Sequence, residues 1–338
     1  MINSQFKLTA PYAIERFCES LDFEKGKVLV RPQMMSICKA DMRYYFGLRD
    51  AKVLKQRLPM TLIHEACGTV LSDPTGEFKR GEKVILLPNI PGAETNAAEN
   101  YRLDSRFRSS RADGFMQETL NMPTSQIVRY SDIETESASM VEFISVGVHA
   151  VKSFMKQIKY KPEHIGVWGD GALGYVICSL LKHYLPDTNV YIIGVNRTKL
   201  SLFQFVEERW TVDEVPNQVM FDATFECVGG AATASAIAQM IDTIQPEGIM
   251  MLLGVSEELV PINTRMVLEK GITMLGRSRS GREDFENAVE VMEKDTKLAK
   301  QMKMLVSDVM KIENIGNIHE AFQKSKIADY KMVLDWKI

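Results

Sequence analysis

Four residues of this sequence have side chains that can bind a transition metal and support chemistry around it. They are Cys38, the adjacent pair His64 and Glu65, and Glu142. Thiolate, imidazole and carboxylate groups are ligands that Zn²⁺ accepts, and three protein ligands with one open position are typical of a catalytic zinc. Their spacing alone does not decide for a metal site, because a single cysteine or histidine on an apolar strand more often belongs to the core.

A glycine-rich turn is a second candidate site, and it could bind phosphate groups. Residues 165–174 read as a short apolar strand followed by G-x-G-x-x-G at Gly169, Gly171 and Gly174. In a dinucleotide-binding turn the first glycine allows the tight bend and the second lets the backbone approach a pyrophosphate. The third lets the following helix pack against the strand.

The segments on both sides of this turn also fit a dinucleotide site. Ala172 and Leu173 open an apolar stretch that Pro186 stops, and a second strand follows at residues 190–195. A pyrophosphate would then lie at the helix N-terminus, where free N–H groups favour an anion. Strand, turn and helix together favour dinucleotide binding over a plain structural turn.

The elements that must hold these residues differ along the chain. Residues 1–146 are rich in apparent strands, and regular alternation of strands and helices begins only near residue 145. Such alternation indicates an α/β fold with a doubly wound parallel sheet. We expect strands at 190–195, 220–227, 248–253 and 272–276 and helices at 198–209, 231–244 and 263–270.

The end of the chain predicts an interrupted domain. Residues 331–336 read as a closing strand that most simply returns to the β-rich part. We therefore expect a dinucleotide-binding domain at 147–277 inserted in a catalytic domain of 1–146 and 278–338, with the ligand crevice between them.

Composition excludes several classes of function. The 338 residues carry a net charge of −3, so no global basic field attracts nucleic acid or a membrane surface. We find no signal-peptide pattern and no apolar run long enough to span a bilayer, and we expect a cytoplasmic protein. The five cysteines are odd in number and scattered, which argues against a disulfide framework.

Several segments resemble, in the right order, the motifs of the zinc-dependent medium-chain dehydrogenases/reductases, with sorbitol-type polyol dehydrogenases as the most similar branch. The resemblance covers nearly the whole chain. It implies a Rossmann domain beside a GroES-like catalytic domain, zinc-site roles for Cys38, His64 and Glu142, and a carboxylate at Glu65 that either binds zinc or lies directly behind a ligand. The segments are 36–45, 63–70, 79–84, 113–118, 141–150, 225–229 and 248–254.

The sequence also departs from the pattern of this family. Ala40 and Arg43 stand where a hydroxyl and a histidine usually relay a proton, so another proton route is needed. Ile63 replaces the glycine that usually precedes the His-Glu pair. Residues 88–114 contain no cysteine, although the family usually has a four-cysteine lobe for a structural zinc there. We therefore expect one catalytic zinc per chain.

With these departures, the sequence resembles the ribulose-5-phosphate reductases of bacterial teichoic acid synthesis. The segment between the expected helix 198–209 and strand 220–227 is also shorter than usual, which predicts a trimmed outer half of the nucleotide fold. The resemblance implies that D-ribulose 5-phosphate is reduced to D-ribitol 5-phosphate, with zinc as the Lewis acid at the C2 carbonyl and hydride from the nicotinamide. It also implies a homo-oligomer, a dimer or tetramer, and association with a ribitol-phosphate cytidylyltransferase.

Five cations are candidates for binding the substrate phosphate. Lys39 and Arg43 follow the zinc cysteine, and Arg277, Arg279 and Arg282 follow the last strand of the nucleotide domain. A dianionic phosphate is well bound by guanidinium forks. Each arginine taken singly is more simply a solvated surface charge, but three within six residues favour a phosphate site.

The end of the second strand predicts the cofactor. Matching Lys199 and the leucine after it to the basic-Leu pair of the family puts Gly194 where NAD enzymes have an acid for the ribose hydroxyls. No carboxylate occurs at 190–205. We expect room for a 2′-phosphate, bound by Arg197, Asn196 and Lys199, and hence NADP(H). The alternative is that Arg197 only begins a solvated helix.

Two other functions fit the same residues. A polyol dehydrogenase for an unphosphorylated sugar alcohol would not need the phosphate-binding cations. A non-catalytic dinucleotide sensor would explain Ala40 and Arg43, since both replace proton-relay residues. Metal analysis together with a steady-state assay separates these alternatives.

Overall fold

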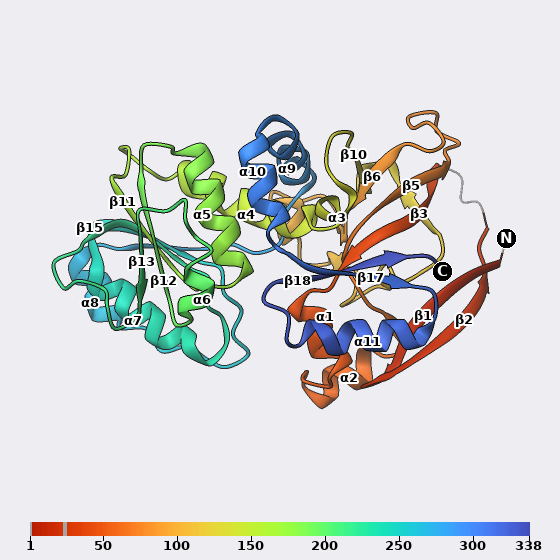
Figure 1. Cartoon of the computed structure of the whole chain (residues 1–338), viewed down its shortest axis with the longest axis horizontal. Coiled ribbons are helices and arrows are strands. Elements are labelled where there is room, and N and C mark those ends of the chain that lie inside the picture. Colours follow the sequence, from red (N-terminus) through yellow and green to blue (C-terminus); the bar gives the residue numbers. More distant parts are fainter. Residues whose placement is uncertain (1, 23–25) are drawn as a thin grey trace. The chain divides into compact units, whose positions relative to one another are not determined.

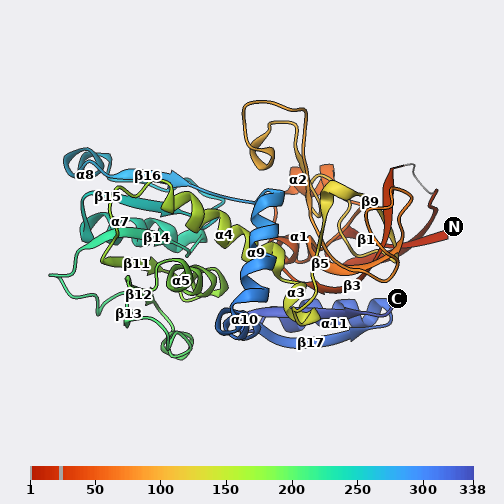
Figure 2. The same ribbon diagram turned by 90° about the horizontal axis from the view of Figure 1, so that it is seen from above.

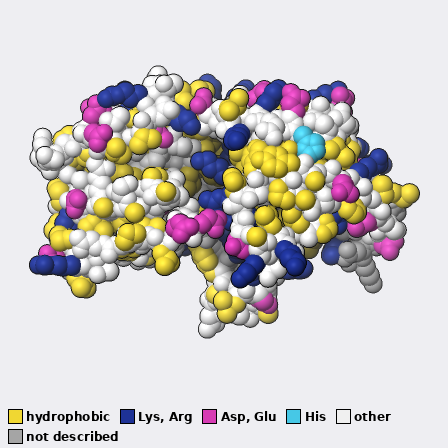
Figure 3. All heavy atoms as spheres, turned by 90° about the horizontal axis from the view of Figure 1, so that it is seen from below, with side chains coloured by type: hydrophobic (Ala, Val, Ile, Leu, Met, Phe, Trp, Pro, Cys, Tyr) yellow, Lys and Arg dark blue, Asp and Glu magenta, His cyan; other side chains and the backbone are white. Residues whose placement is uncertain are grey.

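The computed structural model describes residues 2–22 and 26–338, and the chain divides into two compact units. One unit consists of Met1–Ser145 and Arg279–Ile338, and the other of Val146–Ser278. Within the described residues, no helix combines the length and the apolar character needed to cross a lipid bilayer. Figure 3 shows basic and acidic side chains interspersed over the face that it draws.

The second unit is built on a six-stranded parallel sheet (Figure 1). Its strand order is β13-β12-β11-β14-β15-β16, so the doubly wound fold expected from the sequence is confirmed. Its strands are β11 (His164–Trp168), β12 (Asn189–Gly194), β13 (Glu208–Thr211), β14 (Phe221–Glu226), β15 (Ile244–Leu252) and β16 (Thr273–Gly276).

Helices cover both faces of this sheet, which is why its strands are apolar on both sides. Figure 1 shows α5 on one side of the strands and α7 and α8 on the other. Phe225 of β14 packs against Phe154 of α4 at a ring distance of 5.2 Å, whereas Trp168 and Phe221 belong to a cluster with α7. The helices are α4 (Val141–Met155), α5 (Ala172–Tyr184), α6 (Arg197–Leu200), α7 (Thr233–Thr243) and α8 (Thr264–Lys270), with a 3₁₀ turn η3 (Gly230–Ala232).

The expected helix at 198–209 is wrong, because α6 is a single turn. Phe203 is fully buried, and its ring packs against that of Tyr175 in α5 at 5.1 Å. Turns therefore replace further helix and lead directly into β13. The outer half of this fold was expected to be trimmed. Only its helix, α6, is shortened, because the outer strand β13 is present.

The first unit contains a seven-stranded sheet in the order β10-β6-β5-β3-β18-β17, with β9 also paired to β3. A three-stranded sheet, β2-β1-β4, and a two-stranded sheet, β7-β8, complete it. The strands are β1 (Ile2–Ala10), β2 (Ala13–Ser20), β3 (Lys27–Ser36), β4 (Met60–Thr61), β5 (Glu65–Ser72), β6 (Lys83–Leu86), β7 (Asn89–Ile90), β8 (Arg106–Phe107), β9 (Leu120–Pro123), β10 (Ile127–Arg129), β17 (Val306–Ile312) and β18 (Lys331–Trp336).

The last strand of the chain lies inside this sheet. β18 runs parallel to β17 and antiparallel to β3. Short helices accompany the sheet (Figure 2). They are α1 (Lys39–Tyr45), α2 (Ala51–Arg57), α3 (Thr135–Ala138), α9 (Arg282–Lys294), α10 (Thr296–Lys303) and α11 (Ile315–Ser325), with 3₁₀ turns η1 (Glu99–Tyr101) and η2 (Thr124–Gln126).

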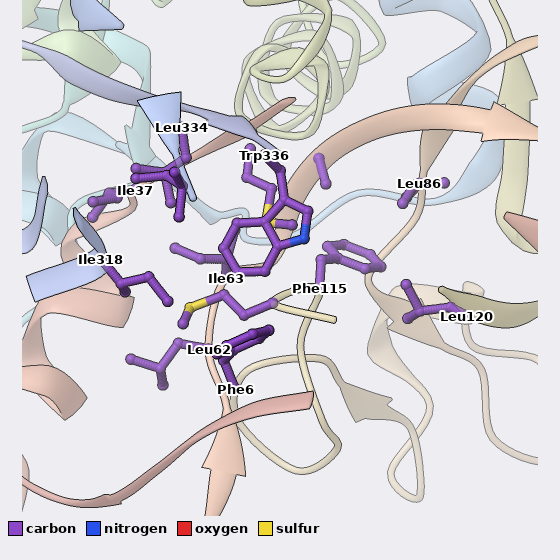
Figure 4. Close-up of a cluster of buried hydrophobic side chains, with 14 of the residues drawn as sticks. Phe6, Ile37, Leu62, Ile63, Leu86, Phe115, Leu120, Ile318, Leu334 and Trp336 are labelled. Atoms are coloured by element: carbon purple, nitrogen blue, oxygen red, sulfur yellow. The ribbon is translucent and has the colours of Figure 1, made fainter. Parts of the chain in front are cut away.

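A large apolar core fixes the elements of the first unit (Figure 4). Trp336 of β18 meets Phe6 of β1 edge to face, with ring centroids 5.4 Å apart. Leu62 and Ile63, which directly precede the candidate metal residue His64, are fully buried in the same cluster. The backbone at this site is therefore held by packing from several strands.

Candidate metal and cofactor sites

The structure brings Cys38, His64 and Glu65 together. One ligand atom from each lies within 4.8 Å of the others. The pairing of β3 with β5 sets this geometry, because Ser36 at the end of β3 lies opposite Glu65 at the start of β5. Cys38, two residues past Ser36, is thereby carried to the side of the His-Glu pair.

This donor set fits a zinc ion. Zinc bonds of about 2.0–2.3 Å in a tetrahedron put the ligand atoms roughly 3.3–3.8 Å apart, so the three groups need only close slightly around the ion. His64 and Glu65 are buried and Cys38 is half-buried. A thiolate, an imidazole and a carboxylate in a partly enclosed position form the ligand set of a catalytic zinc site.

Asp41 holds the histidine of this cluster. One carboxylate oxygen, Oδ1, lies 3.2 Å from His64 Nδ1 and accepts the Ile63 N–H at 3.1 Å, and Oδ2 accepts the Cys38 N–H at 3.1 Å. Burial lowers the pKa of His64, but Asp41 and Cys38 outweigh burial and raise it well above its ordinary value. With Nδ1 facing Asp41, Nε2 is the nitrogen left to bind a metal.

Sequence reasoning assigned no role to Asp41, although it follows Cys38 by only three residues. The signal in the sequence was a carboxylate close to a candidate metal ligand, because a carboxylate that bonds to a metal-binding histidine fixes the tautomer and orientation of its ring. Its side chain is completely buried, and its pKa is lowered by His64 and hydrogen bonds against the raising effect of burial.

Glu65 is held by two partners. Its Oε1 lies 2.5 Å from Lys331 Nζ, and its Oε2 accepts a hydrogen bond from Ser36 Oγ. Burial lowers the pKa of Lys331, but the charge of Glu65 raises it overall. Both carboxylate oxygens therefore already have donors, and an oxygen bound to zinc would have to be shared with or released from one of them.

Glu142 lies outside the three-residue cluster but within its electrostatic reach. It is in the first turn of α4 and is buried. Burial raises its pKa, and the charge of His64 lowers it while that of Glu65 raises it, which leaves the value at about 7. Among the residues expected to bind zinc, Glu142 is thus the one that the structure does not bring into the cluster.

The residue before His64 has a strained backbone. Ile63 has a φ of 69°, in the left-handed region where glycine is favoured. Such strain costs about 1–3 kcal/mol and persists only where the surroundings impose it. Here Asp41 binds the Ile63 N–H and Phe115 donates its N–H to the Ile63 carbonyl at 2.8 Å.

A turn of the segment without cysteine, residues 107–111, packs onto the cluster. The Phe107 ring lies 5.4 Å from that of His64, and Ser109 Oγ donates to Asp41 Oδ1 at 2.5 Å. On the same aromatic ring lies the guanidinium of Arg279, 5.4 Å from its centroid. Ser109 and Arg279 both have positive φ, at 59° each, so this contact region is also strained.

The five candidate phosphate residues have different surroundings. Arg282 donates to the backbone carbonyls of Thr124 and Ile127 at 2.9 and 3.0 Å, which gives it a structural role. Arg277 belongs to the other unit and donates to the Gly276 carbonyl at 2.7 Å. Lys39 and Arg43 lie on α1, and Arg279 lies on the ring of Phe107.

The glycine turn has the expected form. β11 leads into it and α5 leaves it, and Gly169 has a φ of 119° that favours glycine. A side chain at Gly174 would approach the Gly169 carbonyl to 1.9 Å, which no real Cβ tolerates. Nothing lies within 4 Å of a Cβ at Gly171, so the backbone there is open to a ligand.

The expected open space at Gly194 is not there. A Cβ at Gly194 would lie 2.6 Å from Cβ and from Oδ2 of Asp170, so the carboxylate of the glycine turn occupies this position. The end of β12 has no acidic residue of its own, but the carboxylate of Asp170 lies beside it. Arg197 forms an ion pair of 2.5 Å with Glu214, and Asn196 caps α6 by accepting the Lys199 N–H at 3.1 Å.

Comparison with known families agrees with this architecture. A family model described as the alcohol dehydrogenase GroES-like domain matches residues 24–132, and one described as the glucose dehydrogenase C-terminus matches residues 135–336. The chain belongs to the medium-chain dehydrogenases/reductases.

Curated relatives that match this chain over its full length include ribulose-5-phosphate reductases. The chain is 40% identical to a ribulose-5-phosphate reductase of Streptococcus pneumoniae, over 100% of this chain and 98% of that protein. It is 42% identical to the ribulose-5-phosphate reductase of Bacillus spizizenii, with both chains covered completely. The solved structure of Staphylococcus aureus TarJ in complex with NADPH superposes with a TM-score of 0.90 at 38% identity, again over 100% of both chains.

Proposed function

We propose that this medium-chain dehydrogenase/reductase is a zinc-dependent, NADPH-linked reductase that converts D-ribulose 5-phosphate to D-ribitol 5-phosphate for teichoic acid synthesis. Full-length identity of about 40% to reductases of that name supports the substrate. The observation that carries the chemistry is the cluster of Cys38, His64 and Glu65, whose ligand atoms lie within 4.8 Å of one another.

Cys38 and His64 would hold the zinc, with Glu65 or Glu142 as the third protein ligand. When bound, the zinc supplies a Lewis acid that polarises the carbonyl being reduced. Asp41 orients the imidazole through Nδ1, and Lys331 holds Glu65 at 2.5 Å. The ring of Phe107 packs against that of His64 at a tilt, with ring centroids 5.4 Å apart.

Arg279 is the cation best supported as a partner of the substrate phosphate. Its guanidinium lies over the ring of Phe107, and the same ring contacts His64. The positive charge of Arg279 is therefore near the candidate metal residues. Burial and a second guanidinium, that of Arg111, lower the pKa of Arg279. Arg111 sits on the same turn as Phe107, since its N–H bonds to the Phe107 carbonyl at 2.8 Å. Two neighbouring guanidiniums favour a dianion.

The cofactor is proposed to bind at the glycine turn. The open backbone at Gly171 would approach the pyrophosphate, with Gly169 and Gly174 shaping the turn, and Arg197, with Asn196 and Lys199, would contact the 2′-phosphate. NADPH is bound in the solved structure of Staphylococcus aureus TarJ, which is 38% identical to this chain. The nicotinamide supplies the hydride, and the protein supplies orientation.

The remaining parts of the proposal concern assembly and location. We propose a homo-oligomer, a dimer or tetramer, that associates with a ribitol-phosphate cytidylyltransferase in the cytoplasm. The support is chemical, because a transferase of that kind consumes the ribitol phosphate that this reaction makes. Size-exclusion chromatography with light scattering, alone and with the transferase, tests both interactions.

A substrate panel tests the proposed reaction. Purified enzyme is given D-ribulose 5-phosphate or unphosphorylated D-ribulose, each with NADPH and with NADH, and the product is identified by mass spectrometry. We expect turnover of the phosphorylated ketose with NADPH. Equal kcat/KM for both ketoses would favour a polyol dehydrogenase instead, and cofactor binding without turnover of any ketose would favour a sensor.

A further inference from the structure

A carboxylate from the glycine turn occupies the position that an acidic residue of the second strand would otherwise take. Asp170 Oδ2 accepts the backbone N–H groups of Val195 and Asn196 at 2.8 and 2.6 Å. These amides belong to the two residues that directly precede Arg197. One oxygen of Asp170 therefore fixes the backbone from which the proposed 2′-phosphate residue extends.

The same contact explains why residue 194 is glycine. A Cβ at this position would lie 2.6 Å from Oδ2 and 2.8 Å from Cγ of Asp170. Real Cβ atoms do not approach other heavy atoms so closely, so any larger residue would push the carboxylate away from its two amides. Gly194 and Asp170 thus form one structural pair, although they are far apart in the sequence.

The guanidinium of Arg197 also has an ion-pair partner at the surface. Its guanidinium lies 2.5 Å from Glu214, and Glu214 accepts from the N–H and the hydroxyl of Thr211 at the end of β13. Arg197 lines a groove of about 500 Å³ that includes a second guanidinium and has no carboxylate among its lining residues, Arg197, Leu200, Ser201, Gln204 and Arg209. The two hydrogen bonds of Asp170 thus hold the backbone directly before Arg197, one of the two arginines that line this groove.

We propose that Asp170 is a positioning residue that sets the preference for NADPH, by holding the 195–196 backbone so that Arg197 meets the 2′-phosphate. This inference rests on the proposed use of NADPH. A carboxylate near a phosphate would ordinarily repel it, but two amide donors offset the charge of Asp170. The cofactor preference then depends on the hydrogen bonds of Asp170 rather than on its charge.

Three variants and fluorescence titration with NADPH and NADH test this proposal. Asp170→Ala removes the acceptor, and we expect the Kd for NADPH to rise about 10- to 100-fold while that for NADH changes less than about threefold. Asp170→Asn keeps an oxygen that can accept both amides, and its Kd ratio should stay within about threefold of wild type. Gly194→Ala should weaken NADPH binding in the wild-type background and much less in Asp170→Ala, because the clash is then absent.

Asp222 provides a matched control in the same unit. Its Oδ2 also accepts two backbone amides, those of Glu163 and His164, at 2.7 and 2.9 Å, but at the start of β11 and β14 rather than at their carboxyl ends. Asp222→Ala should lower the Tm by an amount similar to Asp170→Ala and leave the ratio of the two Kd values unchanged.

Each contrary result has a distinct meaning. A wild-type protein that binds NADH as tightly as NADPH overturns the proposed cofactor itself. If wild type prefers NADPH and Asp170→Ala keeps that preference, only the role of Asp170 is overturned. Equal weakening of both cofactors would indicate a direct contact of Asp170 with a group that both share, and an Asp170→Asn as weak as Asp170→Ala would indicate a role of charge. Either outcome overturns the proposal.

Discussion

Lys331 Nζ lies 2.5 Å from Glu65 Oε1, and the two side chains are only 6% and 0% exposed. This buried ion pair joins the first residue of β18 to the residue beside His64, the candidate metal residue. Two charges in such a place are costly to desolvate, and each depends on the other for compensation. The pair therefore couples the electrostatics of the candidate metal site to the stability of the sheet.

Replacing Lys331 by methionine should destabilise the metal-free protein strongly. The change leaves Glu65 as an uncompensated buried charge, which costs about 3–5 kcal/mol in comparable cases. Bound zinc supplies a positive charge near Glu65, so the loss should be smaller in the zinc-loaded protein. Urea unfolding with zinc and with a chelator measures both values.

Lys311→Met is the control for this variant. Lys311 forms an ion pair with Glu313 in which both partners are more than half exposed, so its loss should change stability very little. An equal loss for Lys331→Met with and without zinc would contradict the proximity of Glu65 to the ion.

Cys38→Ala should remove both the zinc and the activity and leave the fold intact. The thiolate is one of the few ligands that the cluster offers, whereas the core of this unit is built elsewhere. We expect one zinc per chain in the wild type and almost none in the variant, by elemental analysis, with an unchanged far-ultraviolet circular dichroism spectrum. Cys18→Ala, at an exposed position, should keep full zinc and activity. Two tightly bound zincs in the wild type, or an active Cys38→Ala, would sink the assignment.

Zinc binding should weaken as the pH falls, beginning above the ordinary pKa of histidine. In the metal-free protein Asp41 and Cys38 raise the pKa of His64 against the lowering effect of burial, so the imidazole keeps its proton at pH values where a free histidine has lost it. Zinc must displace that proton, so the affinity is full above the raised pKa and is lost as the pH falls through it.

Asp41→Asn tests the cause of this pH dependence. Removing the carboxylate lowers the pKa of His64, so the fall in zinc affinity should move to lower pH. Competition with a chromophoric chelator between about pH 6 and 9 measures it. Superimposable pH curves for the variant and the wild type would show that Asp41 does not control the proton on His64.

Arg279→Ala should affect phosphorylated and unphosphorylated substrates differently. Losing a charge-assisted bond to the phosphate costs about 1.5–3 kcal/mol, or roughly ten- to more than a hundredfold in kcat/KM for ribulose 5-phosphate. The value for ribulose should hardly change. Arg282→Ala is the comparison, because Arg282 bonds to backbone carbonyls and should lower the Tm rather than discriminate between substrates. A uniform loss on both ketoses with Arg279→Ala would remove the phosphate role.

Arg197→Ala should reduce the preference for NADPH over NADH. The guanidinium belongs to the first residue of α6, three residues past the end of β12, and forms a surface ion pair with Glu214. We expect kcat/KM with NADPH to fall about tenfold or more and that with NADH to change little. Arg265→Ala removes another surface guanidinium, paired with Glu269 on α8, and should leave the ratio as in the wild type. An unaltered ratio in Arg197→Ala would mean that the 2′-phosphate binds elsewhere.

The sequence was sufficient to predict the doubly wound sheet, because apolar strands and helical stretches alternate with regular spacing. It was not sufficient for the segment after α6. Residues 198–209 have a helical pattern, but burial of Phe203 against Tyr175 outweighs this local preference. Tertiary packing of this kind cannot be read from the periodicity of one segment.

The same limit applies to the residues that support the sites. The types of Cys38, His64 and Glu65 indicate metal binding, but the partners Asp41 and Lys331 become visible only when β3, β5 and β18 are paired. The absence of an acid in β12 was correctly read from the sequence. That Asp170 fills the vacant position depends on the convergence of two turns at the carboxyl ends of β11 and β12, which no single segment encodes.

The position of β18 has a consequence for the order of events during synthesis. This strand lies between β3 and β17, yet it is translated after the whole of Val146–Ser278. When all strands of the nucleotide unit have been made, the sheet of the other unit still lacks its inner strand β18. At that stage Glu65 also lacks its partner Lys331. Domains form as they emerge from the ribosome. The candidate metal site therefore acquires its buried Lys331–Glu65 ion pair late, so a nascent chain stalled before Lys331 should be able to bind dinucleotide while Glu65 is still an uncompensated charge.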